Sequence, residues 1–252
     1  MAIITLSKGI FSGARELARL VSENLGYSLV SREEIVEKTA QYGLPGSRLE
    51  WARRRRLGVL ARKDLEWMHY LVYARAALTK EIRQGSLIYL GSDGRTLLRD
   101  FPTVLHINVV ADMEHRIRNL IRRTDYVMNQ KKARQLIEKI DAKTARWRRT
   151  IHDDGIRDAS DFDLTIEPDV MSLAEACDLI GATAGQPQYL TTGKALETID
   201  LLTVAAELRA RIAMKEDVAD DNIGVEVQGG VIVVTGSVRS TEDLDGIREL
   251  FN

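Results

Sequence analysis

Small and basic residues cluster where the first predicted strand gives way to a helix. Residues 2–6 (AIITL) are short, apolar and β-branched, which is typical of a buried strand. The polar segment that follows supplies the residues in question: Lys8, Ser12, Gly13, Ala14 and Arg15. A phosphate binds where backbone N–H groups converge at a helix N-terminus, which requires small residues and gains from positive charge. We therefore predict a phosphate-binding loop, with an ordinary strand-to-helix turn as the alternative, since the full Walker pattern is absent.

A second polar group, Gly91-Ser92-Asp93-Gly94-Arg95, follows the strand predicted at residues 87–90. In open α/β sheets, ligands bind beyond the carboxyl ends of the strands. A carboxylate there can accept hydrogen bonds from a base or sugar, and an arginine can form a fork to a phosphate. Asp93 and Arg95 are therefore predicted to bind substrate, and a solvated turn explains the same residues equally well.

Positive charge is concentrated between Arg116 and Arg149, where twelve Lys or Arg accompany three Asp or Glu. Phosphoryl transfer depends mainly on positioning and charge stabilisation, which an arginine-rich lid can supply. The candidates for this role are Arg116, Arg122, Arg123 and Arg146. A solvated helix pair is the alternative, and nucleic-acid binding ranks third.

The pattern of hydrophobic residues predicts strands that alternate with helices. Strands are expected at residues 2–6, 27–30, 87–90, 104–110 and 162–166. Helices are expected at residues 14–25, 32–41, 49–60, 63–84, 113–123, 131–149 and 172–182. Ser31 with Glu34, and Ser172 with Glu175, have the spacing of capping boxes. This order predicts an α/β domain with a parallel sheet and helices on both faces.

The C-terminal part differs in charge and in pattern. Residues 195–252 hold twelve acidic and five basic residues, whereas the rest of the chain is basic. A helix at 198–214, a hairpin of 223–227 and 231–235, and a helix at 241–251 are predicted. We expect one domain over residues 1–183, a linker at 184–194 and a small α+β module at 195–252.

Composition excludes several classes of protein. A single cysteine, Cys177, cannot form an intramolecular disulfide, and the four histidines lack metal-ligand spacing. No apolar run reaches the roughly 18 residues of a membrane span. No segment resembles a signal peptide, so a cytoplasmic protein without a membrane partner is expected.

The order of these motifs resembles the cytidylate-kinase-like family of P-loop nucleoside-monophosphate kinases. The resemblance covers residues 1–183 and rests on residues 3–8, 12–16, 25–27 and 32–35, on the strand at 104–111, on Asp141 as a lid aspartate, and on the strand at 162–166. It implies a P-loop-kinase-type fold that binds a nucleotide, with ATP and Mg²⁺ as cofactors. It also implies transfer of the ATP γ-phosphoryl group to a nucleoside monophosphate or a similar small acceptor.

The chain departs from the family pattern at five positions. Phe11 and Ala14 replace glycines of the phosphate loop, and Ser31 replaces the aspartate of the D-R-E motif. Ser92 and Thr144 replace arginines that would carry charge to the substrate. The alternative hypothesis is therefore a catalytically impaired nucleotide sensor or scaffold.

The C-terminal module resembles a BON module that lacks its last strand. The resemblance rests on Leu201, Leu202, Ala205 and Leu208 of the first helix, and on the two hairpin strands. It implies that the first helix packs on the hairpin and that an open sheet edge supports a homo-oligomer or regulates the larger domain.

Overall fold

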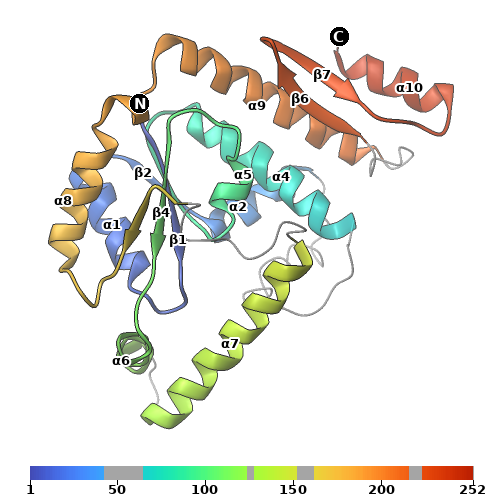
Figure 1. Ribbon diagram of the computed structural model, residues 1–252. Helices are drawn as coiled ribbons and strands as arrows, with labels where there is room; N and C mark the ends of the chain where they lie inside the picture. Colours follow the sequence, from blue (N-terminus) through green and yellow to red (C-terminus); the bar gives the residue numbers. More distant parts are fainter. Residues whose placement is uncertain (43–64, 124–127, 152–161, 216–222, 252) are drawn as a thin grey trace.

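The computed structural model describes residues 1–42, 65–123, 128–151, 162–215 and 223–251 (Figure 1). Its main sheet is entirely parallel, with the strand order β2-β3-β1-β4-β5. The strands are β1 (Ile3–Lys8), β2 (Ser28–Ser31), β3 (Leu87–Leu90), β4 (Val104–Val109) and β5 (Leu164–Ile166). The predicted parallel α/β sheet is therefore confirmed.

The helices that connect these strands follow the predicted order. They are α1 (Ala14–Leu25), α2 (Arg32–Lys38), η1 (Thr39–Tyr42), α4 (Leu65–Ile82), α5 (Gly94–Leu97), α6 (Met113–Arg123), α7 (Gln130–Ile151) and α8 (Leu173–Ala184). Both predicted capping boxes are present, at Ser31 and at Ser172. The α-helix predicted to reach residue 41 ends at Lys38 and continues as a 3₁₀ turn. The helix predicted at 49–60 lies outside the described residues.

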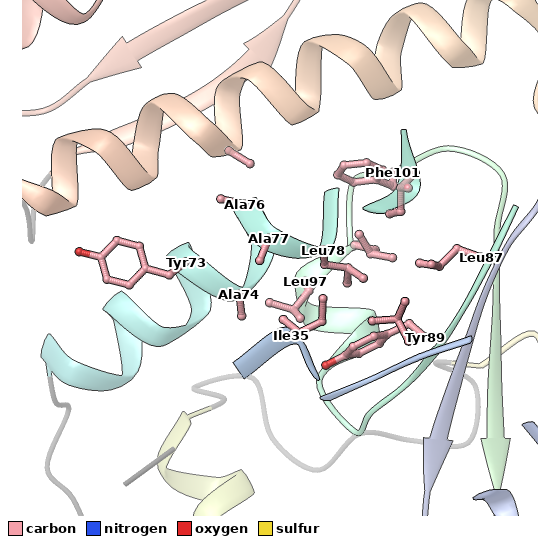
Figure 2. Packing of buried hydrophobic residues seen from close by; sticks show 14 of the residues in the cluster. Ile35, Tyr73, Ala74, Ala76, Ala77, Leu78, Leu87, Tyr89, Leu97 and Phe101 are labelled. Carbon is pink, nitrogen blue, oxygen red and sulfur yellow. The ribbon is translucent and has the colours of Figure 1, made fainter. Parts of the chain in front are cut away.

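Alternation along the strands sends apolar side chains to both faces of the sheet. On one face, Ile4 and Ile88 pack in a cluster with residues of α1 and α8. On the other face, Ile3 and Tyr89 pack in a cluster with residues of α2, α4 and α5. Figure 2 shows part of this second cluster, including Ile35 of α2 and Leu97 of α5. The sheet is thus buried on both sides, and ligands can approach the strands only at their ends.

The C-terminal elements are η4 (Pro187–Tyr189), α9 (Gly193–Met214), β6 (Gly224–Gln228), β7 (Val231–Thr235), α10 (Thr241–Arg248) and η6 (Glu249–Phe251). The strands β6 and β7 form the predicted antiparallel hairpin. Helix α9 begins at Gly193, inside the predicted linker, because the side chain of Thr192 caps it by accepting a hydrogen bond from the backbone N–H of Ala195. None of the helices in the described residues is both long and apolar enough to cross a membrane.

Helix α9 contributes to two separate hydrophobic clusters. Its residues Ile199, Leu202 and Ala206 pack in the same cluster as α4, and Figure 2 shows α9 running alongside α4. Further along, Leu208 and Ile212 pack with residues of the hairpin in a second cluster. Leu202 belongs to the cluster of the larger domain, and the hairpin reaches that cluster through Val227 of β6. Small residues on both helices, such as Ala76 and Ala210, allow the close approach.

A group of polar contacts also joins α9 to the larger domain. Glu207 accepts hydrogen bonds from the Tyr42 hydroxyl at 2.7 Å and from Lys80 Nζ at 2.8 Å. Burial acts to raise the pKa of Glu207, but the contacts with Lys80 and Tyr42 outweigh it and leave that pKa below its usual value. Burial and Glu207 raise the pKa of Tyr42 to about 12, so its hydroxyl remains a donor at neutral pH.

We predict that Glu207→Gln lowers the free energy of unfolding by about 1 kcal/mol at neutral pH, because it removes a charged acceptor from a partly exposed site. A carboxylate with a lowered pKa stabilises the fold above its unfolded pKa and loses that contribution as the pH falls through the folded value. Urea unfolding should therefore show a smaller loss of stability below about pH 5 in Glu207→Gln than in the wild type. Identical pH profiles would contradict this account.

Candidate active site

The predicted phosphate loop lies at the carboxyl edge of the sheet, between the end of β1 and the start of α1. Lys8 is the last residue of β1, and the backbone N–H of Gly9 donates to the carbonyl of Val109 at the end of β4. Gly13 precedes α1 with a φ of +88°, a conformation that residues with a Cβ adopt only with strain. Gly13, the N-cap residue of α1, provides no side-chain hydrogen bond to the first turn, and the N-terminus of a helix favours an anion.

Ser12 gives this loop its most distinctive feature. The residue is 1% exposed, and its buried Oγ has no hydrogen-bond partner among the residues that the structure describes. A buried hydroxyl that makes no hydrogen bond destabilises the protein unless a ligand or a water molecule supplies that bond. Ala14 is also buried, whereas Arg15 is exposed on the first turn of α1. The predicted loop residues are thus together, but Arg15 is turned outward.

Two further residues adjoin the loop that the sequence did not indicate. A Cβ placed on Gly13 would lie 3.8 Å from His115 Nε2 and 3.8 Å from the Cβ of Pro168. His115 stands on α6 and Pro168 follows β5, so both come from segments far along the chain. His115 belongs to no recognisable sequence motif, so residue spacing alone could not place it beside Gly13.

The first half of the loop is bound to α6. Arg116 Nε donates to the carbonyl of Ile10 at 2.9 Å, and Asn119 Nδ2 donates to the carbonyl of Phe11 at 3.0 Å. The side chains of Ile10 and Phe11 pack against the cluster that joins α6 to α7. Phe11 has a φ of +60°, so the glycine of the family pattern is replaced by a residue held in a left-handed conformation. Its side chain serves to attach the loop to α6 and α7.

The predicted lid residues are largely engaged with other groups. Arg116 forms a bidentate ion pair with Asp141, at 2.9 and 2.7 Å, so two predicted catalytic residues neutralise one another. Arg123 pairs with Glu16 of α1, and Arg122 donates to Asn119 at 2.7 Å. Arg146 lies on α7, and its side chain is outside the described residues. Helices α6 and α7 pack together through a small hydrophobic cluster and lie beyond the carboxyl end of β4 (Figure 1).

Asp93 lies at the same edge of the sheet but binds protein groups. It is 3% exposed, and it accepts hydrogen bonds from the Tyr89 hydroxyl at 2.7 Å, the Tyr70 hydroxyl at 2.8 Å and Arg32 Nε at 3.1 Å. The Arg32 guanidinium also lies over the ring of Tyr70, 5.1 Å from its centroid. Arg95 is half-buried on α5, the short helix that begins directly after Asp93. We call Asp93, Arg32, Tyr70 and Tyr89 the Asp93 cluster.

Burial and the neighbouring groups together determine the protonation of Tyr70, Tyr89 and Arg32 in the Asp93 cluster. Burial and the Asp93 carboxylate raise the pKa of Tyr70 and of Tyr89 well above the usual value, so both hydroxyls remain donors. Burial acts to lower the pKa of Arg32, but Tyr70 and Asp93 raise it above its usual value. The guanidinium is therefore charged at any pH at which the protein is folded.

The two glycines around Asp93 have a packing role. A Cβ on Gly91 would lie 2.6 Å from the Tyr89 hydroxyl oxygen and 2.7 Å from Asp93 Oδ1. A Cβ on Gly94 would lie 2.9 Å from the Thr5 Cβ and 2.9 Å from Tyr89 Cδ1. The contact between Tyr89 and Asp93 therefore requires Gly91, and the packing of Tyr89 and Thr5 requires Gly94.

These features agree with the comparisons with known proteins. The model of the cytidylate kinase-like family matches residues 3–169, and the chain belongs to that family. An uncharacterized protein from Eubacterium ventriosum has a similar structure, with a TM-score of 0.56, 15% identity, and coverage of 73% of this chain and 98% of that one. Shikimate kinase from Bacteroides thetaiotaomicron aligns at a TM-score of 0.46 and 11% identity, covering 73% of this chain and 99% of that one. A gluconokinase from Sinorhizobium meliloti aligns at a TM-score of 0.40 and 14% identity, covering 72% of this chain and 91% of that one. The curated proteins include no match.

We predict that Gly91→Ala lowers the free energy of unfolding by about 1–3 kcal/mol, because the new methyl group must displace Tyr89 or Asp93. Gly193→Ala is the matched control, since nothing lies within 4 Å of its Cβ position at the first residue of α9. That variant should be neutral or slightly stabilising. Thermal and urea unfolding of both variants measure the difference, and equal effects would refute a packing role for Gly91.

Proposed function

We propose that this protein binds ATP through the loop of residues 9–15 and acts as a phosphotransferase on a small acceptor. The observation that carries the proposal is Ser12, whose buried Oγ has no hydrogen-bond partner within the described part of the chain and adjoins the N-terminus of α1. A nucleotide phosphate would accept hydrogen bonds from the α1 N–H groups and from the Ser12 hydroxyl. Lys8 and Arg15 would add positive charge at the two ends of the loop.

Mg²⁺ fits this loop as a partner of the nucleotide. No group of three or more potential metal ligands occurs within the described ranges, and Mg²⁺ in kinases is held mainly by substrate phosphates, water and one or two protein groups. The Ser12 hydroxyl is the loop side chain suited to that role. When bound, the ion would neutralise charge on the phosphates.

In the catalytic form of the proposal, an acceptor oxygen bonds to the γ-phosphorus while the bond to the β–γ bridging oxygen breaks and ADP departs. Arg122, Arg123 and Arg146 would then supply lid charge. Arg116 and Asp141 would act on the loop, because Arg116 holds the carbonyl of Ile10 while Asp141 orients its guanidinium. Arg95 would approach the acceptor from α5.

A second candidate function is a nucleotide sensor without turnover. The observation that favours it is the engagement of charged residues with one another: Arg116 with Asp141, and Asp93 with Arg32 and two tyrosines. The substitutions at Ser92 and Thr144 remove two further cations of the family pattern. Such a site retains the phosphate loop while lacking free charge for the transferred group.

We predict that Ser12→Ala weakens ATP binding about tenfold to a hundredfold, the effect of losing a hydrogen bond to a charged group. The same change should leave the free protein equally or more stable, because it removes an unpartnered buried hydroxyl. Ser22→Ala is the control: its Oγ donates to the carbonyl of Tyr27 at 2.7 Å, so its loss should cost stability and leave ATP affinity unchanged.

Calorimetric titration with ATP, with and without Mg²⁺, measures the affinity, which we expect to be micromolar or weaker in the wild type. An ADP-release assay with cytidine monophosphate and other small acceptors then separates the two candidates. Robust turnover would exclude the sensor. Absence of nucleotide binding in the wild type would exclude both and leave a scaffold.

We also propose that residues 195–252 form a BON-like unit that supports self-association. In the described residues, its sheet consists of β6 and β7 alone, so both outer edges lack a neighbouring strand. Val231 on β7 is 60% exposed. Unpaired edges and exposed apolar residues favour pairing between chains.

Sedimentation of the wild type over a range of concentrations should therefore show self-association, and Val231→Lys should weaken it, because a charged residue on an edge strand opposes pairing. Arg239→Glu, at an exposed position after β7, tests whether any charge change near the hairpin has the same effect. A wild type that stays monomeric throughout, or a Val231→Lys protein that associates unchanged, would contradict this proposal.

A further inference from the structure

We propose that a basic face of α7 binds an acidic face of α10 in a second copy of this chain. The basic face consists of Lys132, Lys139 and Lys143, and the acidic face consists of Glu242, Asp245 and Glu249. This contact differs from pairing of the β6 and β7 edges, because it depends on charge and joins unlike surfaces of two molecules. It is also independent of ATP binding.

The charge of the chain is unevenly distributed along its length. The whole sequence has 36 Lys or Arg and 37 Asp or Glu, and residues 195–252 hold five of the basic and twelve of the acidic residues. Residues 1–194 therefore hold 31 basic and 25 acidic residues. A nearly neutral chain thus consists of a positive part and a negative part. Complementary charges of this kind steer association and fix its orientation.

The basic face lies along one side of α7. Lys139 and Lys143 follow Lys132 by seven and eleven residues, close to two and three turns of a helix, so the three side chains share one side. Lys132 and Lys139 are exposed, and Lys143 is half-buried. Ala133 and Ile137 pack in the cluster that joins α7 to α6. The lysines therefore lie outside the contact between the two helices.

The lysines of this face differ in their pairing from the arginines of α6 and α7. Three of those arginines form ion pairs within the molecule: Arg116–Asp141, Arg123–Glu16 and Arg134–Glu114. Among the described residues, no ion pair involves the three lysines. The other acidic residue of α7, Glu138, directly precedes Lys139 and projects about 100° away from it. The positive charge of this face is therefore available to a partner.

The acidic face lies on α10 and on the first residue of η6. Asp245 and Glu249 follow Glu242 by three and seven residues, the spacing of one side of a helix, and all three side chains are exposed. Ile247 packs in the hairpin cluster on another side of the helix. Arg248 pairs with Asp245 at 3.2 Å, and it compensates only one of the three carboxylates.

The two faces match in the spacing of their charges. Lys132 and Lys139 are seven residues apart, and so are Glu242 and Glu249. At 1.5 Å per residue each pair spans about 10 Å, so two helices lying side by side can bring both lysines near both carboxylates. Exposed ion pairs stabilise a contact only slightly, so we expect association that depends strongly on concentration and salt.

The two faces lie too far apart to meet within one molecule. Figure 1 shows α6 and the start of α7 at one end of the molecule and α10 at the other. A second copy of the chain supplies the complementary charge to each face. Contact between unlike surfaces repeats from one molecule to the next unless it closes into a ring.

The experiment compares two charge-reversed forms of the full chain by sedimentation velocity over a range of concentrations. One form carries Lys132→Glu, Lys139→Glu and Lys143→Glu, and the other carries Glu242→Lys, Asp245→Lys and Glu249→Lys. Each form alone should stay monomeric, because its two faces then have the same sign of charge. An equimolar mixture should associate, because every face of one form is complementary to a face of the other.

Salt and a matched control separate this contact from other causes of association. Raising the salt from about 0.01 M to about 1 M shortens the Debye length from about 30 Å to about 3 Å and should weaken wild-type association about tenfold. Pairing of strand edges would persist at the higher salt. The control reverses three exposed basic residues outside both faces and should associate as the wild type does: Arg19→Glu, Arg99→Glu and Lys194→Glu.

Melting temperatures identify a triple variant that fails to fold. In that case the single reversals Lys139→Glu and Glu242→Lys are compared in the same way, alone and mixed. Each should weaken association, and the mixture should recover part of it.

The inference is overturned if the wild type stays monomeric at about 0.01 M salt, if the mixture of reversed forms does not associate, or if the control dissociates as the lysine variant does. A monomeric wild type that binds a single-stranded oligonucleotide through the three lysines would assign the basic face to nucleic acid instead. Association that neither salt nor charge reversal changes would assign it to the strand edges.

Discussion

A buried carboxylate must be surrounded by donors, and in this protein that requirement couples several elements at the carboxyl edge of the main sheet. Asp93 lies beneath α4 and receives hydrogen bonds from α2, α4 and β3 through Arg32, Tyr70 and Tyr89. Removing one partner would leave charge uncompensated in a low-dielectric interior, which is far more costly than the pair is worth at a surface. The positions of three elements are therefore coupled, and Gly91 and Gly94 are needed because any Cβ there would enter the same space.

The loop between β1 and α1 is held by a combination of apolar packing and backbone hydrogen bonds. Ile10 and Phe11 combine apolar packing on α6 and α7 with carbonyl groups that accept from Arg116 and Asn119. An aromatic residue in a left-handed conformation is costly, and this double attachment offsets the cost. The loop and the two basic helices therefore form one connected unit, and a rearrangement of α6 would change the backbone at Ile10 and Phe11.

Local patterns predicted the elements well and the partners of the polar residues poorly. The bounds of α1 and β3 and both capping boxes follow from apolar spacing and from residues three positions apart, so the sequence contains the whole signal. Asp93 was correctly placed after a strand, but its partners Arg32 and Tyr70 are 61 and 23 residues away, and turn chemistry says nothing about them. The same applies to His115 beside Gly13. The sequence identifies Phe11 only as a replacement for a glycine of the family pattern, and the packing of α6 on α7 shows where its side chain lies.

The part of the chain beyond the family match is needed to complete the kinase-like fold. The match ends at residue 169, yet Ala176, Cys177 and Ile180 of α8 belong to the cluster on one face of the sheet. On the other face, Ile199, Leu202 and Ala206 of α9 cover α4. Helix α4 also carries Tyr70, and η1, which follows α2, carries Tyr42, whose hydroxyl donates to Glu207 of α9. Helix α9 therefore contacts α4, which carries Tyr70 of the Asp93 cluster, and η1, which follows the helix that carries Arg32. Because α9 also forms the core of the hairpin unit through Leu208 and Ile212, one continuous helix connects that unit to α4 of the larger domain.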